Sequence, residues 1–583
     1  MGKLFYIQVI DDSAKISAEN NAVRIETIYP ARGQMIDRNG ELVVYNKAAY
    51  DLMIVPALVE EFDTAELCSI LEIDPAKITE RIKETRKYRY RPTVLVSQMT
   101  SEDYAKLQEV MHKYNGFLVQ NRVVRAYSSQ LGGHILGYVS EVNQKHLEQD
   151  EYYQMGDYVG VSGIECQYEK ELRGEKGQRK LYVDNKGRVQ GSYRDGKFDV
   201  IPKPGKKLQL TIDSDLQKYG ESLMQNKIGS IVAIEPSSGE VLALISAPDY
   251  DPENLIGRSR NRMLEELQND SLNPFLNRAL KGSYPPGSPF KLLNGVIALQ
   301  ENIITEHTQF TCNGRASYPM QCSHDHHSPL DLLPAIENSC NPYFRRAFMN
   351  TIEFDGKRSS ARKGLTIWRN HLLTMGIGVK TGIDLPYEGK GFVPDTSYFD
   401  RYYPAKNWGA STIYSMSIGQ GELLQTPLQM ANQAAVIANR GFFYKPHVVK
   451  AIEGQPLSEN YTAKIVSTVD SKHFAPIVEG MTHVYTGEHG TARYYKSDSI
   501  VMCGKTGTVE NPHGKDHSMF IAFAPKDNPQ IAISVVVENG GFGGNWAAPI
   551  ATLMMEKYIL GEISKKFHWK EVQILDTDLI SNK

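Results

Sequence analysis

The 583-residue chain lacks any long hydrophobic run. A membrane-spanning helix needs about 20 consecutive, mostly apolar residues, and no stretch of even about 18 is present. No secretory signal peptide is visible either. The chain also lacks a strong net charge, because its 65 basic residues are nearly balanced by 68 acidic ones. This balance gives no electrostatic reason to expect nucleic acid or another strongly charged partner.

Cysteine is scarce, with six residues in the whole chain. That is too few for the dense pattern of a disulfide scaffold. Hydrophobic residues make up 41% and charged residues 23% of the sequence, as is typical of a globular protein. The length allows about two to four domains, each with a core of its own. Three of the cysteines nevertheless lie close together, at Cys312, Cys322 and Cys340.

The first part of the chain consists mainly of short strands and turns. The alternation of apolar and polar residues at 23–28 predicts a half-buried strand, and the DRNG sequence at 37–40 predicts a hairpin turn. Proline and glycine at 202–205 punctuate the chain, and the character of the sequence changes after them. We therefore predict two domains, residues 1–205 and residues 206–583.

The second part alternates strands with long helices. Residues 208–212, 230–234 and 240–245 are predicted strands, and residues 214–224 a helix capped by Asp213 or Ser214. A multidomain chain of this pattern belongs to the α/β or α+β class.

The sequence YPPGSPFK at 284–291 carries the main chemical signal. Proline and glycine form a stiff turn, and Pro289 suits the first position of a helix. Ser288 would then lie at the helix N-terminus, where backbone N–H groups favour developing negative charge. Lys291 follows one turn later on the same face. A serine becomes a good nucleophile when a neighbouring base removes its proton, and a lysine of lowered pKa can be that base.

Ser-x-x-Lys is a weak signal by itself, because Ser360 and Lys363 form a second copy. That copy lies in a basic, polar run and is predicted to be a solvated loop.

The second element is Ser339-Cys340-Asn341, which follows a helical stretch at 329–338. Its hydroxyl and amide suit proton transfer and the binding of a substrate carbonyl. The same pattern is also typical of a helix cap, and it recurs elsewhere in the chain, so this alternative stays open.

The third element is Lys505-Thr506-Gly507-Thr508, which follows a strand-like run at 500–503. Gly507 removes a side chain where a peptide substrate could approach as an added strand. Lys505 and Thr506 could bind a carboxylate. A second Lys-Thr-Gly at 380–382 precedes a turn that contains proline, and we interpret it as structural.

These three elements occur in the order found in penicillin-binding proteins and class A β-lactamases. With their flanking sequences, they make the chain resemble the class B penicillin-binding proteins, and most closely the penicillin-binding protein 2 group of the cell-elongation machinery. The resemblance covers nearly the whole chain. It includes four further pairs of motifs: PARG at 30–33 with DRNG at 37–40, GVSGIE at 160–165 with LRG at 172–174, AIEP at 233–236 with GEVLA at 239–243, and GQG at 419–421 with TP at 426–427.

The resemblance implies an elongated, non-catalytic pedestal followed by a transpeptidase domain with a β-lactamase-like sheet and flanking helices. It implies that Ser288 is acylated by a peptidoglycan stem peptide, that Lys291 is the base, and that Ser339 and Asn341 assist. Lys505, Thr506 and Thr508 would hold the terminal carboxylate of the peptide. β-Lactam antibiotics would acylate Ser288 in the same way, and catalysis would need no cofactor.

The resemblance also implies partners and a location. The pedestal would contact a membrane glycosyltransferase and other proteins of the elongation complex. Members of the family carry an N-terminal transmembrane helix, and residues 3–10 look like the segment that follows it. We therefore expect a soluble truncation of a bacterial inner-membrane protein whose catalytic domain lies in the periplasm.

Four residues predict a structural zinc site, Cys312, Cys322, His327 and Cys340. Three cysteines and one histidine are a common tetrahedral zinc set, and some relatives bind zinc in this region. His324 or His326 could replace His327. A disulfide between Cys312 and Cys322, buried reduced thiols, or simply exposed histidines are the alternatives.

Two other functions share the same motif set. A serine β-lactamase would need a base that activates water, and the long N-terminal region is unusual for such an enzyme. A β-lactam sensor or non-catalytic scaffold is the other alternative, although all three elements are intact.

Overall fold

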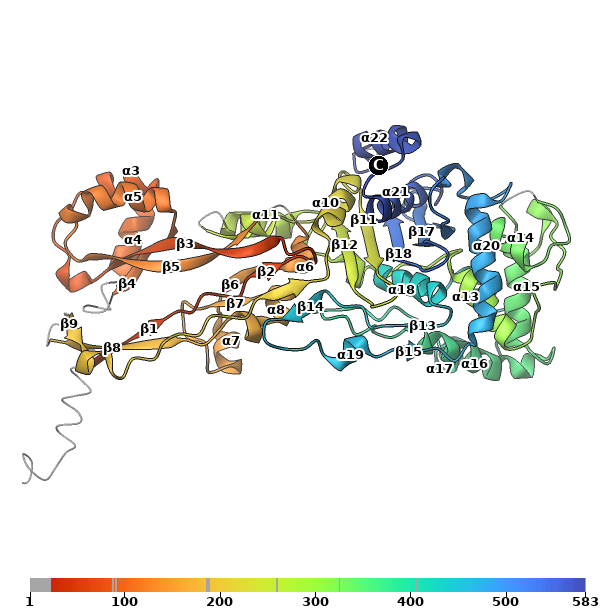
Figure 1. Cartoon of the computed structure of the whole chain (residues 1–583), viewed down its shortest axis with the longest axis horizontal. Coiled ribbons are helices and arrows are strands. Elements are labelled where there is room, and N and C mark those ends of the chain that lie inside the picture. Colours follow the sequence, from red (N-terminus) through yellow and green to blue (C-terminus); the bar gives the residue numbers. More distant parts are fainter. Residues whose placement is uncertain are drawn as a thin grey trace, which may run out of the picture.

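The computed structural model describes residues 23–581, apart from 86–88, 90–91, 129–130, 185–188, 258–259, 324–325 and 404–406. The predicted post-membrane segment at 3–10 lies outside these residues. Figure 1 shows an elongated molecule with an extended N-terminal part at one end and a thicker helical and sheet part at the other. No helix in the described part is long and apolar enough to cross a membrane.

The N-terminal part contains a long antiparallel ribbon of β3 (Leu42–Ile54) and β5 (Phe117–Tyr127), with β4 (Thr93–Met99) on the other edge of β3. The helices α3 (Thr64–Leu71), α4 (Pro75–Thr85) and α5 (Ser101–Val110) pack at its far end (Figure 1). A second sheet joins β1 (Val23–Ile28), β8 (Gly177–Val183) and β9 (Val189–Ser192). The predicted strand at 23–28 is therefore confirmed.

The predicted turn at 37–40 is also confirmed, between β2 (Met35–Ile36) and β3. The buried Asp37 carboxylate accepts hydrogen bonds from the backbone N–H groups of Asn39 and Glu41. Gly40 supplies the positive φ, +93°, that closes the turn.

A buried cluster of charged side chains joins three segments of the N-terminal part that are far apart in sequence. The Glu165 carboxylate is fully buried and lies 2.6 Å from both the Arg32 and the Arg125 guanidinium groups. Arg32 also pairs with Glu169 at 2.5 Å. These contacts give a physical reason for two of the resembling motifs, because Arg32 comes from PARG and Glu165 from GVSGIE. Removing one partner would leave a buried charge uncompensated, which is strongly destabilising.

One sheet crosses the predicted boundary at residue 205. Strand β10 (Leu208–Leu210) pairs in parallel with β2 and antiparallel with β14 (Val449–Ile452). The segment before β10 is also bonded to the N-terminal part, because the Gly205 N–H donates to the Ala31 carbonyl at 2.9 Å. Residues on both sides of 205 thus belong to one layer. The division of the chain at this position stays a prediction.

The second part is built on a five-stranded, fully antiparallel sheet. Helices α10 (Ser214–Leu223) and α21 (Ala547–Leu560) cover one face, while α13 (Phe290–Gln300), α18 (Pro427–Ala438) and α20 (Phe474–Thr486) lie on the other (Figure 1). An antiparallel sheet with segregated helices is α+β. In order, the strands are β12 (Val241–Ala247), β11 (Gly229–Ile234), β18 (Ile531–Val537), β17 (His517–Ala524) and β16 (Cys503–Val509).

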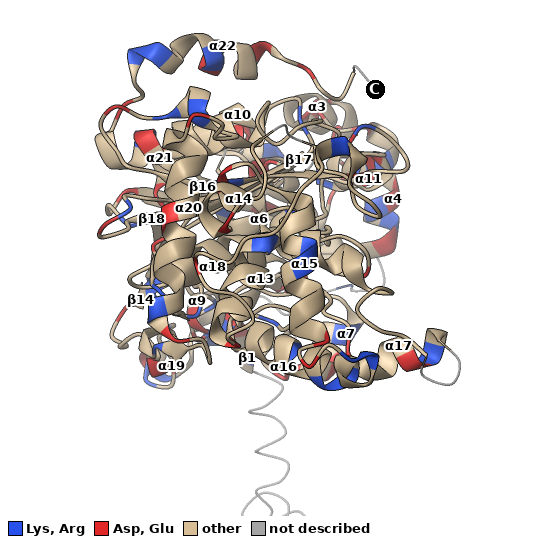
Figure 2. Cartoon of the chain, turned by 90° about the vertical axis from the view of Figure 1, so that its right-hand side faces the viewer, with Lys and Arg blue, Asp and Glu red and all other residues tan. Residues whose placement is uncertain are grey.

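The predicted cap of α10 is confirmed in this part, and the predicted strand before Lys505 begins later than expected. Helix α10 is capped by Asp213, whose side chain accepts from the Leu216 N–H. Thr426 and Pro427 cap and begin α18. The run at 500–503 is a strand only from Cys503 onward, so Lys505 lies near the beginning of β16. Figure 2 views the end of the molecule that carries α13, α15 and α20, and shows basic and acidic residues intermixed over it.

Candidate active site

Ser288 lies in a tight turn that leads into α13. The Ser288 carbonyl accepts from the Lys291 N–H at 3.1 Å, and Pro289 already has helical angles. Gly287 has a φ of +62°, which favours glycine, and its N–H donates to the Gly419 carbonyl at 2.8 Å. The positive φ of Gly287 and its hydrogen bond to Gly419 therefore fix the turn. Ser288 itself is partly exposed.

Lys291 is completely buried beneath this turn. Its ammonium group donates to the Ser339 carbonyl at 2.7 Å, to the Ser339 hydroxyl at 3.1 Å and to the Asn341 side-chain oxygen at 2.5 Å. Burial lowers the pKa of Lys291 to about 8, against a smaller, opposite effect of Cys340 and Cys322. With this pKa the neutral form is a minority of roughly a tenth at pH 7, far more than for an ordinary lysine, and this form can act as a general base.

The second element connects two helices around Lys291. Ser339 follows α14 (Leu332–Glu337), and Asn341 begins α15 (Asn341–Ile352). Ser339 has a φ of +55°, a strained conformation for a serine. Its hydroxyl contacts Lys291, and α15 has no side-chain cap. The Ser339 side chain therefore caps no helix. Its backbone does close α14, because the N–H groups of Ser339 and Cys340 donate to the Ile336 and Ala335 carbonyls.

The third element lies on β16, the edge strand of the five-stranded sheet. Lys505 is fully buried, and burial together with the charge of Lys291 lowers its pKa well below the ordinary value. The two lysines are thus electrostatically coupled, so protonation of one disfavours protonation of the other. A Cβ on Gly507 would lie only 2.7 Å from the Pro289 ring, so glycine here also lets the strand approach the Ser288 turn.

Two residues that the sequence did not single out hold the threonines of this strand. The Thr506 hydroxyl donates to the Thr491 hydroxyl at 2.8 Å. The Thr508 hydroxyl accepts from the Gly543 N–H at 3.2 Å. Both partners come from loops that are remote in sequence, and no local pattern marks them.

The second copies of the motifs lie outside this site. The Ser360 hydroxyl donates to the Lys357 carbonyl, and Lys363 is exposed on α16 (Ala361–Thr374). The prediction of a solvated loop is wrong for Ser360, which is buried where this helix starts. Thr381 bonds to the Glu388 carboxylate, in agreement with a structural role.

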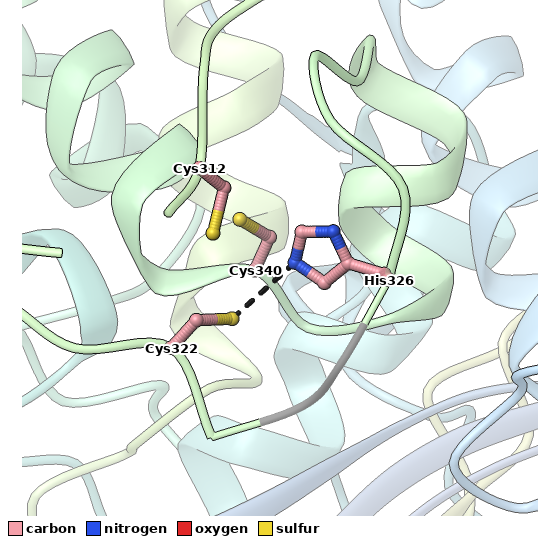
Figure 3. Close-up of side chains that lie close together, drawn as sticks. All are labelled: Cys312, Cys322, His326 and Cys340. Carbon is pink, nitrogen blue, oxygen red and sulfur yellow. Dashed lines mark hydrogen bonds between the residues drawn. The ribbon is translucent and has the colours of Figure 1, made fainter. Parts of the chain in front are cut away.

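Figure 3 shows a second cluster, in which Cys312, Cys322, Cys340 and His326 converge. Their sulfur and nitrogen ligand atoms all lie within 4.8 Å of one another. The structure thus brings in His326 and not His327, whose carbonyl oxygen lies 2.8 Å from His326 Nδ1. None of the three cysteines is joined in a disulfide, so the structure does not support the Cys312–Cys322 disulfide. This Cys₃His set fits a tetrahedral metal ion in type and number of donors.

The cluster is linked to the catalytic residues through Asn341. While its side-chain oxygen accepts from Lys291, its side-chain nitrogen donates to the Gln321 carbonyl at 2.9 Å. Gln321 directly precedes Cys322, and Cys340 stands between Ser339 and Asn341. The segment between α13 and α14 that carries Cys312 and Cys322, here called the insert, therefore supports the loop around Lys291.

Comparison with known families agrees with this arrangement. Residues 229–556 match the penicillin-binding protein transpeptidase domain, and residues 27–210 match the penicillin-binding protein dimerisation domain. The fold and the site therefore define a penicillin-binding transpeptidase that carries a dimerisation-type pedestal.

Individual relatives narrow this class further. The chain is 31% identical to the peptidoglycan D,D-transpeptidase MrdA of Acinetobacter baumannii, over 95% of this chain and 84% of the relative. It resembles the structure of a Helicobacter pylori complex of penicillin-binding protein PBP2 with MreC, at a TM-score of 0.75 and 27% identity, over 92% of this chain and 99% of the other. A chain from a peptidoglycan synthase complex gives a TM-score of 0.74 at 26% identity, with 96% of each chain covered. The chain belongs to the PBP2 (MrdA) group of class B penicillin-binding proteins.

Proposed function

We propose that this chain is a peptidoglycan D,D-transpeptidase that cross-links stem peptides through an acyl-enzyme on Ser288. The observation that carries the proposal is the buried Lys291, which lies one turn after Ser288 and is held by Ser339 and Asn341. Its pKa of about 8 suits proton transfer near neutral pH.

In the first half of the reaction, the Ser288 hydroxyl oxygen attacks the carbonyl carbon between the two terminal D-alanines, and its proton passes to the neutral Lys291 amine. The tetrahedral intermediate collapses, the C–N bond breaks, and the leaving D-alanine amine takes up a proton. In the second half, an amine of a neighbouring stem peptide attacks the ester and loses its proton. The new amide forms as the Ser288 oxygen leaves and is reprotonated.

The edge strand β16 would bind the donor peptide. Lys505, Thr506 and Thr508 are placed to hold its terminal carboxylate. A carboxylate there would favour the protonated form of Lys505, and this charge would in turn disfavour protonation of Lys291. The backbone N–H groups of Ser288 and Thr508 would stabilise the oxyanion, an effect worth roughly 100- to 1,000-fold in rate for each donor.

Formation of a cross-linked product tests the proposal directly. The wild-type protein is incubated with peptidoglycan that carries donor and acceptor peptides, and the digested product is analysed by mass spectrometry. We expect peptide dimers whose formation is blocked by penicillin. Rapid hydrolysis of penicillin without dimers would instead identify a β-lactamase, and a stable penicillin adduct without dimers would identify a sensor.

Gly419→Ala should slow acylation by penicillin. A Cβ at this position would lie 2.2 Å from the Gly287 carbonyl oxygen, so the turn that carries Ser288 has to move. A displacement of about 1 Å can cost roughly 100-fold in rate, and we expect a loss of about 10- to 100-fold in the acylation rate constant.

Gly421→Ala is the matched control for this variant. Gly421 has nearly the same φ, +74° against +73°, but a Cβ there would meet only the Ser415 side chain at 3.2 Å. The positive φ is therefore matched in the two variants. They differ in that only the Gly419 Cβ would collide with Gly287 and with the Phe290 side chain. Equal acylation rates in both would contradict the positioning role of Gly419.

We further propose that Cys312, Cys322, His326 and Cys340 hold a structural zinc ion. The support is the set of four converging donors, three of them buried. Bound zinc would fix the insert that contacts Asn341, and it takes no part in the chemical steps. His326 replaces His327 in this proposal because its ring lies 3.4 Å from the Cys322 sulfur.

Protein purified without added metal should contain about one zinc per chain, measured by elemental analysis. Removal of the metal by a chelator should lower both the melting temperature and the rate of penicillin acylation. His326→Ala should reduce zinc content, whereas His327→Ala should retain it. Zinc far below one per chain in the wild type, or loss of zinc only in His327→Ala, would rule this ligand set out.

The proposed location and partners follow from the relatives. A relative of this chain was solved with MreC, and another within a peptidoglycan synthase complex. We propose that the pedestal contacts elongation proteins, including a membrane glycosyltransferase, and that the protein acts at the inner membrane with its catalytic domain in the periplasm.

A further inference from the structure

A cleft of about 450 Å³ opens where the N-terminal part meets the catalytic sheet. One wall comes from α6 (Gly133–Leu136) and the residues around Tyr138. The opposite wall comes from α12 (Arg278–Lys281) and the loop at 385–387. Clefts at junctions of this kind are preferred places for ligand sites. None of the residues discussed in the proposed reaction lines it.

Aromatic rings form the floor of this cleft. Tyr250, Phe275 and Tyr138 form a triangle of rings, in which Tyr250 lies 5.0 Å from Phe275 and 6.1 Å from Tyr138 between centroids. Tyr138 and Phe275 are 6.3 Å apart, and the His134 ring meets Tyr250 edge-on at 5.2 Å. The rings are therefore locked against one another and present a rigid apolar surface.

Tyr387 stands at the mouth of the cleft in an unusual conformation. Its side chain is 63% exposed although its φ is +68°, a strained value for a bulky residue. The chain on either side of it is fixed, because Leu385 is buried and the Gly389 N–H donates to the Leu280 carbonyl at 2.9 Å. Strain that the surrounding structure maintains is concentrated at functional sites, and here it holds an aromatic ring out beside the cleft.

The polar groups of the cleft are mainly uncharged. Burial lowers the pKa of His134 to about 4, so its imidazole is neutral at neutral pH. His134 Nε2 has no hydrogen-bond partner among the described atoms. The Asp249 carboxyl lies 3.5 Å from it, and burial raises the pKa of this carboxyl well above its usual range, which favours its neutral form. Lys281, whose ammonium lies 4.9 Å from the Tyr387 ring centre, is the cation here, and no described lining residue is acidic. Ser162, Gln268 and Asn277 add neutral hydrogen-bonding groups.

This combination matches a sugar chain in its chemistry. Pyranose rings have apolar C–H faces that pack on aromatic rings, while their hydroxyl and acetamido groups need neutral donors and acceptors. A strongly charged ligand would find one lysine, and a purely apolar ligand would leave the buried His134 nitrogen unsatisfied.

We infer that the cleft between α6 and α12 binds the glycan strand of peptidoglycan, at a site separate from the peptide-binding edge of β16. The inference rests on the proposed function, because a transpeptidase that acts on polymeric peptidoglycan meets the glycan together with the peptide. Lys281 and Ser288 are seven residues apart in sequence, so they lie within at most about 25 Å of each other. One polymeric substrate can therefore contact both sites.

Binding of peptide-free glycan strands tests the inference. The strands are prepared by removing stem peptides from peptidoglycan with an amidase, and their affinity for the whole chain is measured by calorimetry. The measurement is made on protein whose Ser288 has first been acylated with penicillin, so that the active site is blocked. We expect binding to persist in the blocked protein and to weaken about tenfold in Tyr387→Ala.

Three variants make the result specific. Tyr387→Phe keeps the ring and should retain the affinity. Tyr387→Gly also removes the ring but relieves the positive φ, so it should weaken binding as Tyr387→Ala does. Tyr402→Ala removes a tyrosine of similar exposure, 61%, from α17 (Thr396–Tyr402) and should have no effect.

Penicillin acylation of the Tyr387→Ala variant and the identity of the bound ligand test the inference further. Normal penicillin acylation in Tyr387→Ala shows that the active site is intact and separates this inference from the proposed function. The inference is overturned if glycan strands do not bind, if penicillin abolishes their binding, or if only free stem peptides bind at this cleft.

Discussion

In the Ser288→Ala variant we expect no covalent penicillin adduct, where the wild-type chain carries one adduct per molecule in intact-protein mass spectrometry. The reason is that the ester can form only on a hydroxyl at this position. Ser288 lies in the turn just before α13, the helix that carries the buried Lys291, and this turn is fixed by the hydrogen bond from Gly287 to Gly419. Cross-linking activity should be lost to the same extent, because the donor peptide and penicillin use the same ester.

Ser360→Ala is the control, since Ser360 belongs to the second Ser-x-x-Lys copy. Its hydroxyl bonds only locally, to the Lys357 carbonyl at 2.8 Å, and the adduct should form normally. The melting temperature of both variants should be compared with that of the wild type. An adduct that persists on folded Ser288→Ala would move the nucleophile to another residue.

Replacing Lys291 by arginine should lower the acylation rate by roughly 100- to 10,000-fold, the usual range for loss of a general base. Arginine keeps the positive charge, but its pKa is too high for it to become neutral in a protein. Stopped-flow measurement with a chromogenic β-lactam gives the rate constant. Lys363→Arg, at the exposed lysine of the second copy, should leave the rate nearly unchanged.

The pH profile of the wild type provides an independent check on Lys291. Because its pKa is lowered to about 8, the neutral form is a minority below this pH and dominates above it. The acylation rate should therefore rise with pH and level off above about 8. A profile that stays flat from pH 6 to 9 in the wild type, or near-normal acylation in folded Lys291→Arg, would show that another group accepts the proton.

The order of the three short motifs predicts the centre of the site. In the structure, Lys291 bonds to Ser339 and Asn341, and its charge contributes to the lowered pKa of Lys505. Ser288 lies one turn before Lys291, and the catalytic roles of these residues stay a prediction. Each motif is local, so its residues are placed by a single turn, loop or strand, and the local sequence describes that placement well. The strand preference at β16 and the glycine-proline turn before α13 are of this kind.

The supporting contacts could not be predicted in this way. Gly419 belongs to the GQG motif at 419–421, but its contact with Gly287 depends on how two distant loops pack. Thr491 and Gly543 reach β16 from loops whose sequences carry no chemical signal. His326 and His327 are adjacent and chemically alike, so only the path of the backbone decides which ring faces the cysteines.

The extent of the N-terminal part was also harder to predict than its turns. Proline and glycine at 202–205 predict a domain boundary, yet Gly205 packs against Leu172, with no room for a side chain between them. The following strand, β10, then completes a sheet that had begun with β2. Composition indicates where a chain changes direction, but it does not reveal which earlier strand the new one will meet.

The shared sheet at β10 has a mechanical consequence. Because β2 and β14 bond to opposite edges of β10, the two halves of the molecule share a sheet and are not joined by a single linker. Strand β10 leads directly into α10, which packs on β12 of the five-stranded sheet. A continuous set of paired strands and one helix thus connects the N-terminal part with the sheet that carries Lys505. A displacement of the N-terminal part would reach this sheet through β10 and α10, on a path that does not include the Ser288 turn.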